Sequence, residues 1–252
     1  MLEVIVIGSG TGVPSLKRAS PALVVKTYQT CILLDSGPGT LRQLLKVNIH
    51  FSNLDVILYT HLHPDHITDL IHFLFACKYT PAFTREKPVF IFGPRGFLSF
   101  YDQLEKAFGH WIAVPEDKVS LSEISSPSIW AHEDVIITPF ATFHTENSQG
   151  YILQSEGKKV VYTGDTDFDE SLIKVVENAD LLICEASFPS NYKVEGHLTP
   201  VLAGKLAAEA KVKSLLLTHF YPECEAIDIV EECRQVYTGS LFLAQDLLFL
   251  TV

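Results

Sequence analysis

The segment from Asp55 to Leu70, DVILYTHLHPDHITDL, limits the possible fold more than any other part of this 252-residue chain. An apolar strand is expected to end at Thr60, because polar side chains of the kinds that bind metals follow directly. The four side chains of that type are His61, His63, Asp65 and His66. Apolar side chains then recur at helical spacing from Ile67 to Phe75. The segment therefore predicts a strand, a turn that carries metal ligands, and an amphipathic helix.

The spacing of the four side chains indicates two neighbouring binding points. His61 and His63 are two residues apart, so they can converge only on an extended or turning backbone. Asp65 and His66 lie where the helix begins and face an adjacent point. Imidazole and carboxylate ligands suit zinc, iron or manganese. A chance pair of packed or surface histidines is the alternative interpretation of His61 and His63, and the two further ligands favour metal binding over it.

Composition narrows the class of protein. With 47% hydrophobic residues, the chain can bury a large core, and we expect a single domain over residues 1–252. The net charge of -11 argues against an extended nucleic acid as partner, whereas a small anionic ester remains compatible because bound cations dominate their local field. Five cysteines without a C-x-x-C pair indicate neither disulfides nor a cysteine zinc site, so a cytoplasmic location is expected. No apolar run predicts a membrane span or an export signal.

Alternating apolar runs and helical periodicity predict the remaining elements. Strands are expected at 2–7, 22–26, 31–35, 88–92, 135–140, 151–154, 159–163, 181–184, 214–218, 241–244 and 247–252. Helices are expected at 40–47, 97–108, 169–179, 200–212 and 227–237. The glycines at 8, 10 and 12 do not form a dinucleotide fingerprint, because Val13 stands where the third glycine belongs and Pro14 follows it.

Several of these strands end just before a histidine, aspartate or glutamate. The side chains at such ends include His144, Asp165, Glu185 and His219. Loops at strand ends are where rigid elements position functional groups. Each residue alone could equally be a turn or surface residue without a role. Their recurrence at strand ends favours one common site.

The motifs resemble the metallo-β-lactamase superfamily, and within it the ribonuclease Z-like branch. They are GSGTGVPSLKR (8–18), LLDSGPGTLRQLL (33–45), THLHPDH (60–66), FGPRG (92–96), SQGY (148–151), YTGDT (162–166), CEASF (184–188), GHLTP (196–200) and LTHF (217–220). The H-x-H-x-D-H motif alone specifies only the superfamily. Its combination with the segments around Glu185 and His197 indicates the branch.

The resemblance implies an α/β fold, the four-layer αβ/βα sandwich of the metallo-β-lactamase type, with two divalent metal ions at one edge. Zinc is expected first, with manganese or iron as alternatives. The implied ligands are His61, His63 and His144 for one metal, Asp65, His66 and His219 for the other, and Asp165 between them. The branch also suggests a homodimer, and Lys17 and Arg18 resemble a basic loop that contacts substrate.

The same resemblance implies catalytic roles. Asp65 would orient or deprotonate a water molecule, and His197 would act as general acid with its ring held by Glu185. The predicted function is metal-dependent hydrolysis of a phosphodiester by a metal-bridging hydroxide.

The chain departs from the branch in features linked to transfer RNA. Ribonuclease Z proteins that process transfer RNA carry a projecting arm, but only twenty residues separate His144 from Asp165 here, and the region 79–87 is also short. Cys184 stands where the branch usually has histidine, and Ala19 where it often has asparagine. A small substrate is therefore expected. The alternatives are a lactonase or arylsulfatase-like ester hydrolase, a transfer RNA 3'-processing endoribonuclease, and a non-catalytic module that retains the fold.

Overall fold

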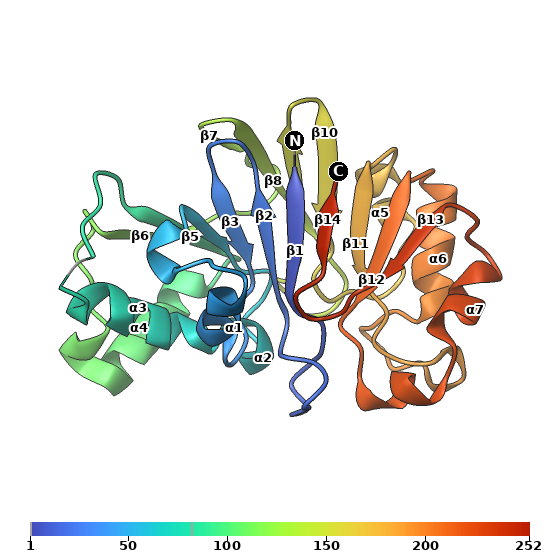
Figure 1. Ribbon diagram of the computed structural model, residues 1–252, viewed down its shortest axis with the longest axis horizontal. Coiled ribbons are helices and arrows are strands. Elements are labelled where there is room, and N and C mark those ends of the chain that lie inside the picture. Colours follow the sequence, from blue (N-terminus) through green and yellow to red (C-terminus); the bar gives the residue numbers. More distant parts are fainter. Residues whose placement is uncertain (1, 82) are drawn as a thin grey trace.

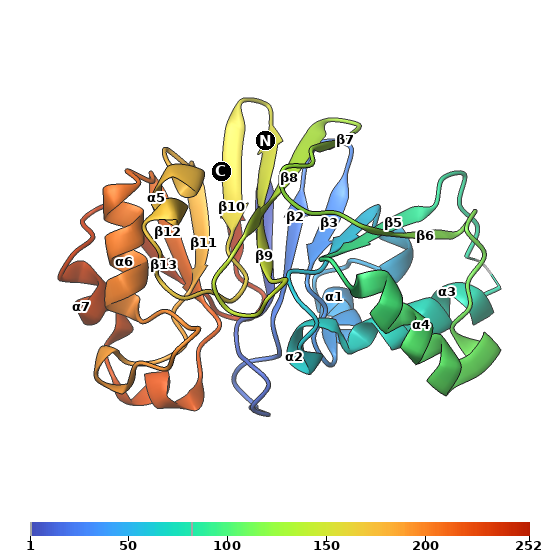
Figure 2. The same ribbon diagram turned by 180° about the vertical axis from the view of Figure 1, so that it is seen from behind.

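Two seven-stranded β-sheets pack face to face in the computed structural model, which describes residues 2–81 and 83–252. The strand order is β14-β1-β2-β3-β4-β5-β6 in the first sheet and β13-β12-β11-β10-β9-β8-β7 in the second. Figure 1 shows α1 to α4 on the outer side of the first sheet and α5 to α7 on the outer side of the second, and the view from behind in Figure 2 shows the same layers. The predicted αβ/βα sandwich is therefore confirmed.

The first sheet changes from antiparallel to parallel along its width. Its strands are β1 (Glu3–Gly8), β2 (Ala22–Lys26), β3 (Cys31–Leu34), β4 (Val56–Leu58), β5 (Val89–Gly93), β6 (Val119–Glu123) and β14 (Phe249–Thr251). β1 pairs antiparallel with β2 and β14, whereas β3 to β6 pair in parallel. Parallel neighbours need crossover connections. The helices in these connections are α1 (Thr40–Lys46), α2 (Pro64–Ile67), α3 (Asp69–Tyr79) and α4 (Phe97–Phe108).

The second sheet also has an antiparallel part and a parallel part. Its strands are β7 (Trp130–His132), β8 (Val135–Ala141), β9 (Gln149–Ser155), β10 (Lys158–Tyr162), β11 (Leu181–Glu185), β12 (Ser214–Thr218) and β13 (Ser240–Leu243). β7 to β10 are antiparallel and β10 to β13 are parallel. The helices after these strands are α5 (Ser171–Val176), α6 (Pro200–Glu209) and α7 (Ile229–Arg234). Within the described parts of the chain, no helix combines the length and the apolar character required to cross a bilayer.

Strand β1 shows why the central strands read as continuous apolar runs. Val4 and Val6 belong to the core between the two sheets, while Ile5 and Ile7 belong to a second core with Leu70 of α3. Successive side chains of a strand point to opposite faces, so a strand covered on both sides must be apolar at every position. The helices of the first sheet thus have a core of their own.

Most predicted elements are present, and the differences have local causes. The helix expected after the ligand cluster is divided at Thr68 into α2 and α3. The helix predicted at 169–179 is shorter, because Asn178 adopts a left-handed backbone conformation before β11. Strands β6 and β7 were not predicted. Both are short and carry few fully buried positions, so they lack a clear apolar pattern.

The two sheets meet at the edge where their parallel strands end. The amide of Gln149 at the start of β9 donates to the carbonyl of Thr60, just after β4 (N···O 3.0 Å). The Tyr151 hydroxyl donates to the carbonyl of Tyr59 (2.8 Å), and both rings are buried. These bonds fix the loop after β4 against the second sheet. Loops from both sheets can therefore contribute to one site at the carboxyl ends of the strands.

Candidate metal centre

The loop between β4 and α2 places its histidines as the sequence predicts. His63 has extended backbone angles (φ -65°, ψ 144°) and directly precedes α2, whose first residue is Pro64. Proline at the first helical position has the fixed φ that a helix needs and lacks the amide that would be unsatisfied there. His61 and His63 therefore precede the helix, and Asp65 and His66 lie in its first turn.

A first group of possible ligands lies where this loop meets the second sheet. It consists of His61, His63, His144 and Asp165, and one ligand atom of each lies within 4.8 Å of the others. His144 Nε2 is 3.1 Å from His63 Nδ1, and both His61 Nε2 and His144 Nε2 are 3.8 Å from Asp165 Oδ2. Three imidazoles and one carboxylate oxygen thus face one point.

A second group lies beside the first. It consists of Asp65, His66 and His219, again with ligand atoms within 4.8 Å of one another. The Nε2 atoms of His66 and His219 are 3.2 Å apart, and each is 3.4 Å from Asp165 Oδ1. The two oxygens of Asp165 therefore face different groups, Oδ2 the first and Oδ1 the second. A carboxylate in this position can contact two cations at once.

Unsatisfied polar atoms indicate that these groups fit cations. His61 Nε2 and Asp165 Oδ1 are buried and have no hydrogen-bond partner among the described residues. Buried polar atoms without a partner are uncommon in proteins and call for a specific explanation, such as an ion. Imidazole nitrogens and carboxylate oxygens are ligands for zinc, manganese and iron. The residues present thus fit divalent cations.

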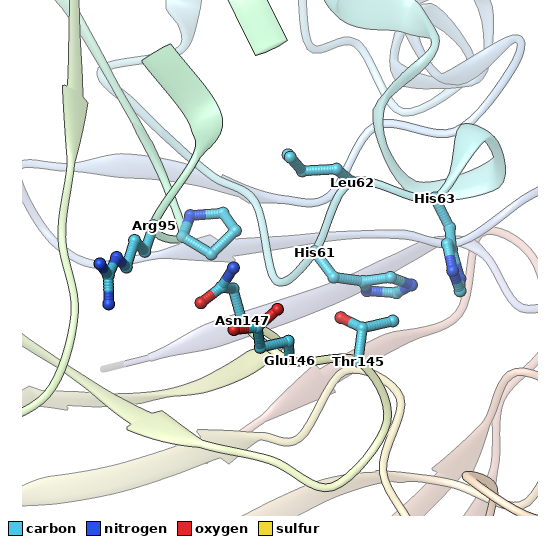
Figure 3. Close-up of a pocket in the computed structure, with 8 residues that line it drawn as sticks. His61, Leu62, His63, Arg95, Thr145, Glu146 and Asn147 are labelled. Carbon is cyan, nitrogen blue, oxygen red and sulfur yellow. The ribbon is translucent and has the colours of Figure 1, made fainter. Parts of the chain in front are cut away.

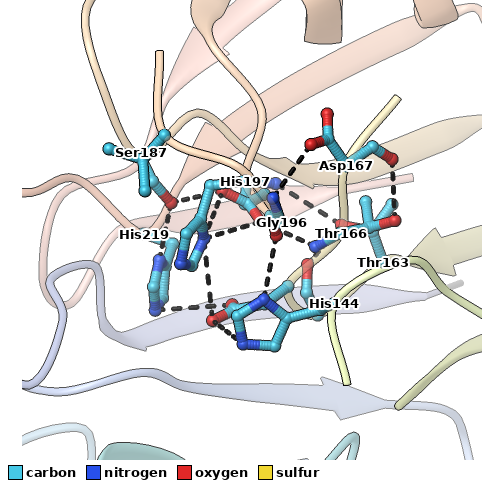
Figure 4. Close-up of polar contacts among 12 residues, drawn as sticks. His144, Thr163, Thr166, Asp167, Ser187, Gly196, His197 and His219 are labelled. Carbon is cyan, nitrogen blue, oxygen red and sulfur yellow. Dashed lines mark hydrogen bonds and ion pairs between the residues drawn. The ribbon is translucent and has the colours of Figure 1, made fainter. Parts of the chain in front are cut away.

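Hydrogen bonds that the imidazoles donate to neighbouring residues orient the rings of His66 and His144. His66 Nδ1 donates to the Asp35 carboxylate (2.8 Å), and His144 Nδ1 donates to the Gly196 carbonyl (2.9 Å; Figure 4). A proton held on Nδ1 leaves Nε2 with its lone pair directed into the site. Asp35 has no role predicted from the sequence. The signal that could have identified it is a charged residue at the end of the apolar strand CILLD.

A second connection of this kind joins His219 to Glu185. The Ser187 hydroxyl donates to Glu185 Oε2, and its oxygen lies 2.8 Å from His219 Nδ1. The Ser187 oxygen can therefore accept a hydrogen bond from Nδ1–H of His219 while its hydroxyl donates one to Glu185. Ser187 was also not identified from the sequence, because a serine in CEASF carries no distinctive signal.

The electrostatics of the site favour a positive charge between its carboxylates. Burial would lower the pKa of His66, but the carboxylates of Asp165 and Asp35 raise it well above its usual value. Burial would raise the pKa of Asp165, but His219 and His66 hold it well below its usual range. For His61, burial dominates and lowers the pKa, which keeps this imidazole neutral and able to bind a metal.

His197 and Glu185 form a pair at the margin of both groups. His197 Nδ1 is 3.1 and 3.2 Å from the two Glu185 oxygens, and the His197 ring centroid is 4.7 Å from that of His144 (Figure 4). Burial lowers the pKa of His197, but the hydrogen bond and charge of Glu185 raise it overall. Glu185 is itself buried and accepts from the amide of Thr166 (2.6 Å). The imidazole is thus held through Nδ1, which leaves Nε2 available.

His197 also permits another interpretation. A ligand atom of His197 lies within 4.8 Å of ligand atoms of Asp165 and His219, so these three could also hold a cation. Both Glu185 oxygens contact His197 Nδ1, so Glu185 is better placed to orient the His197 ring than to bind a cation itself. This favours His197 as an oriented proton donor over His197 as a metal ligand.

An aromatic wall closes the site beside His197 and His219. Phe188 and Tyr221 stack with ring centroids 4.3 Å apart, and the Tyr221 ring lies 6.1 Å from His197 and 5.9 Å from His219. Burial, followed by the charges of nearby carboxylates, raises the pKa of Tyr221 to about 12. Its hydroxyl therefore remains protonated at neutral pH.

Comparison with known proteins agrees with this architecture. Residues 30–220 match the family described as the beta-lactamase superfamily domain, and because this is most of the chain, the protein belongs to that superfamily. Ribonuclease Z of Saccharolobus solfataricus is 27% identical over 303 aligned positions, with all of both proteins covered. The ribonuclease Z-like resemblance and the predicted class, a hydrolase of ester bonds with the metallo-β-lactamase fold, are confirmed.

Solved structures agree on the fold. The metallo-beta-lactamase fold protein YhfI from Bacillus subtilis has a TM-score of 0.88 and 24% identity, and all of both chains is covered. The short form of human tRNase Z has a TM-score of 0.78 and 25% identity, with 99% of this chain and 98% of that chain covered.

Proposed function

We propose that this protein is a single-domain phosphodiester hydrolase. It binds two divalent cations, and zinc is the first candidate. The proposed ligands are the two groups described above, with Asp165 shared between them. One observation carries the proposal: the two oxygens of Asp165 face separate groups of imidazoles, 3.8 Å and 3.4 Å away, beside a histidine that a buried glutamate orients. Two cations held there would polarise phosphoryl oxygens and acidify a water molecule.

The side chains supply the proton transfers of the proposed reaction. Asp65 is the more exposed carboxylate of the centre. Burial would raise its pKa, but the nearby His219 and His66 imidazoles lower it overall. In the proposed reaction, Asp65 orients the attacking water and accepts its proton. As the water oxygen bonds to phosphorus and the ester bond breaks, His197 Nε2 donates a proton to the departing oxygen. Glu185 stabilises the protonated ring before this transfer.

We propose a small substrate in preference to transfer RNA. Between His144 and Asp165 the chain forms only β9 and β10, joined by a tight turn at Glu156 and Gly157. The alignment with the Saccharolobus ribonuclease Z has 303 positions, which exceeds the 252 residues of this chain, so the relative has segments without a counterpart here. The acidic net charge also disfavours a long polyanion.

A ribonuclease that cleaves transfer RNA precursors is the second candidate. It is favoured by the name of the relatives, ribonuclease Z, whose alignments with this chain extend, with gaps, from end to end of both proteins. In such an enzyme the metal centre and His197 would act in the same way, because the scissile bond is again a phosphodiester.

A substrate panel tests the proposal. The protein, loaded with zinc, manganese or iron, is assayed with a bis-aryl phosphate, an aryl sulfate, a lactone and a transfer RNA precursor. We expect metal-dependent cleavage of the bis-aryl phosphate at a higher rate than the sulfate or lactone. Faster turnover of the lactone or the sulfate would contradict the phosphodiesterase proposal. Efficient cleavage of the RNA precursor would replace the small substrate with the second candidate.

A further inference from the structure

A hollow of about 240 Å³ opens beside the candidate metal centre. His61 and His63 lie at one end of it, and Arg95 lies at the other (Figure 3). The segment 145–147, which follows His144, forms the opposite wall with hydroxyl, carboxylate and amide groups. A substrate with its scissile bond at the metals can therefore extend along this hollow toward Arg95.

Arg95 differs from the other cationic side chains near the site. Lys17 and Arg18, which were expected to form a basic loop, both pair with Glu225 (3.2 and 2.9 Å), and Lys193 pairs with Asp167 (2.7 Å). Among the residues that the structure describes, the Arg95 guanidinium has no ion pair or hydrogen bond. A guanidinium carries five donors in a planar fork, which matches a phosphate or carboxylate. Arg95 can therefore bind an anion without breaking an existing contact.

The backbone around Arg95 is fixed. The residue lies between β5 and α4, where Pro94 restricts the chain and Gly96 adopts a left-handed conformation (φ 93°). The Glu123 carboxylate accepts from the amides of Gly96 and Leu98 (2.9 and 3.0 Å), so the amides at the start of α4 are already satisfied. The amides of Gly96, Phe97 and Leu98 are thus already bonded, and the Arg95 side chain supplies free donors at this position.

A second hollow of about 160 Å³ adjoins the first and shares Arg95, Glu146 and Asn147 with it. Ser125 and Ser126 line its far side. Glu146 also lines both hollows, but it forms no ion pair with Arg95 within the described structure. The combined groove thus has one cationic group, one anionic group and several neutral donors and acceptors. This combination suits a sugar or base linked to a phosphate better than a purely apolar group.

We infer that this groove binds a second anionic group of the substrate and that Arg95 holds it. This group is a phosphate separated from the scissile diester by one nucleoside. The inference rests on the proposed function, because it concerns the same substrate. It narrows the substrate class from any small phosphodiester to a dinucleotide-like compound with an additional phosphate. Arg95 is then a specificity-determining residue that contacts the substrate away from the reacting atoms.

The test compares a dinucleoside monophosphate with the same compound carrying a terminal phosphate at its 5' or its 3' end. For each, kcat/KM is measured with the metal-loaded protein. We expect one phosphorylated form to be preferred about 5- to 20-fold, as a charge-assisted hydrogen bond to an exposed guanidinium would provide. The preference should decrease as salt rises from about 0.05 M to 1 M, because screening shortens the range of the interaction.

Three variants assign the preference to Arg95. Arg95→Gln should bring the ratio of the two kcat/KM values close to one, and Arg95→Lys should retain part of it. Glu146→Gln should increase the ratio, because a negative charge is removed from the groove. Arg42→Gln is the matched control: this guanidinium on α1 is also exposed and, in the described part of the chain, also unpaired, so the ratio should stay at the wild-type value.

The outcomes separate the two levels of the proposal. Cleavage of the diester without a preference for either phosphorylated form overturns this inference alone, as does an equal preference in wild type and Arg95→Gln. Failure of the wild-type protein to cleave the dinucleotides while it still cleaves the bis-aryl phosphate also overturns this inference alone. Failure to cleave any of these diesters, the bis-aryl phosphate included, overturns the proposed function, and this inference with it.

Discussion

The two halves of the candidate metal centre are built in different ways. The first sheet contributes four side chains from one short segment, the loop after β4 and the first turn of α2, namely His61, His63, Asp65 and His66. The second sheet contributes three side chains from three loops that are far apart in the sequence, namely His144, Asp165 and His219. The first half is therefore set by local backbone geometry, whereas the second depends on how its strands align. This difference determines which half the sequence reveals and which half a mutation disturbs most.

The supporting contacts differ as well. On the first sheet, the buried Asp35 accepts from His66, from the amide of Thr60 and from the Tyr162 hydroxyl. On the second sheet, His144 bonds a neutral carbonyl and His219 a neutral hydroxyl. A carboxylate acceptor makes an imidazole a stronger ligand than a neutral acceptor does.

The largest expected effect comes from the residue that joins the two halves. Asp165→Asn replaces one of the two carboxylate oxygens with an amide nitrogen and removes the negative charge that faces both groups, so both groups should bind their cations more weakly. We expect a fall in turnover of about 10³-fold or more, since metal ions contribute several kcal/mol to such reactions. Metal content by mass spectrometry should fall well below that of His63→Ala, which affects only the first group. Two ions per chain retained at wild-type affinity in Asp165→Asn would contradict a shared carboxylate.

The next largest effect concerns the proton donor of the second half. His197→Ala should lower turnover about 10²-fold while metal content stays unchanged, because a general acid is removed without loss of a ligand. Glu185→Gln should have a smaller effect, about 10-fold, through the orientation of the same ring. His72→Ala, an exposed histidine on α3, is the control and should retain full activity. Loss of a metal ion in His197→Ala would instead support the alternative role of His197 as a ligand.

The supporting contacts provide a direct comparison of the two halves. Asp35→Asn should weaken metal binding by roughly 10- to 100-fold, because a charged acceptor of His66 becomes neutral. Ser187→Ala should weaken it less, since His219 loses only a neutral partner. Affinities can be measured by competition with a chromogenic chelator. An equal or larger effect of Ser187→Ala would show that the charge of the acceptor is not what distinguishes the halves.

Removal of metal should loosen one half more than the other. Chelation is expected to lower the melting temperature by roughly 5–10 °C, given typical stabilisation by a bound ligand and typical unfolding entropies. The rate of backbone amide hydrogen exchange should rise mainly in the loops of the second sheet, around 144–148 and 190–197. The loop 60–66 should change less, because Gln149 and Asp35 hold its backbone through Thr60. Uniform loosening of both halves would remove the proposed difference.

The same difference explains what could be predicted from the sequence. The first half is a local motif, so strand, turn and helix were predicted from Asp55 to Leu70 by spacing alone. For the second half, the positions of its residues at strand ends indicated a common site, but their roles as ligands came only from the family resemblance, because strand alignment in a sheet is a long-range property. Asp35 and Ser187 were missed, since their roles arise from contacts with residues distant in sequence. The short strands β6 and β7 were missed because partly exposed strands carry little apolar pattern.

Diffraction at the zinc absorption edge from crystals of the zinc-loaded protein tests the central claim most directly. We expect two anomalous peaks roughly 3.5–4 Å apart. One peak should lie among His61, His63 and His144, the other among Asp65, His66 and His219, with Asp165 in contact with both. A single peak, or two peaks of which only one contacts Asp165, would contradict the account.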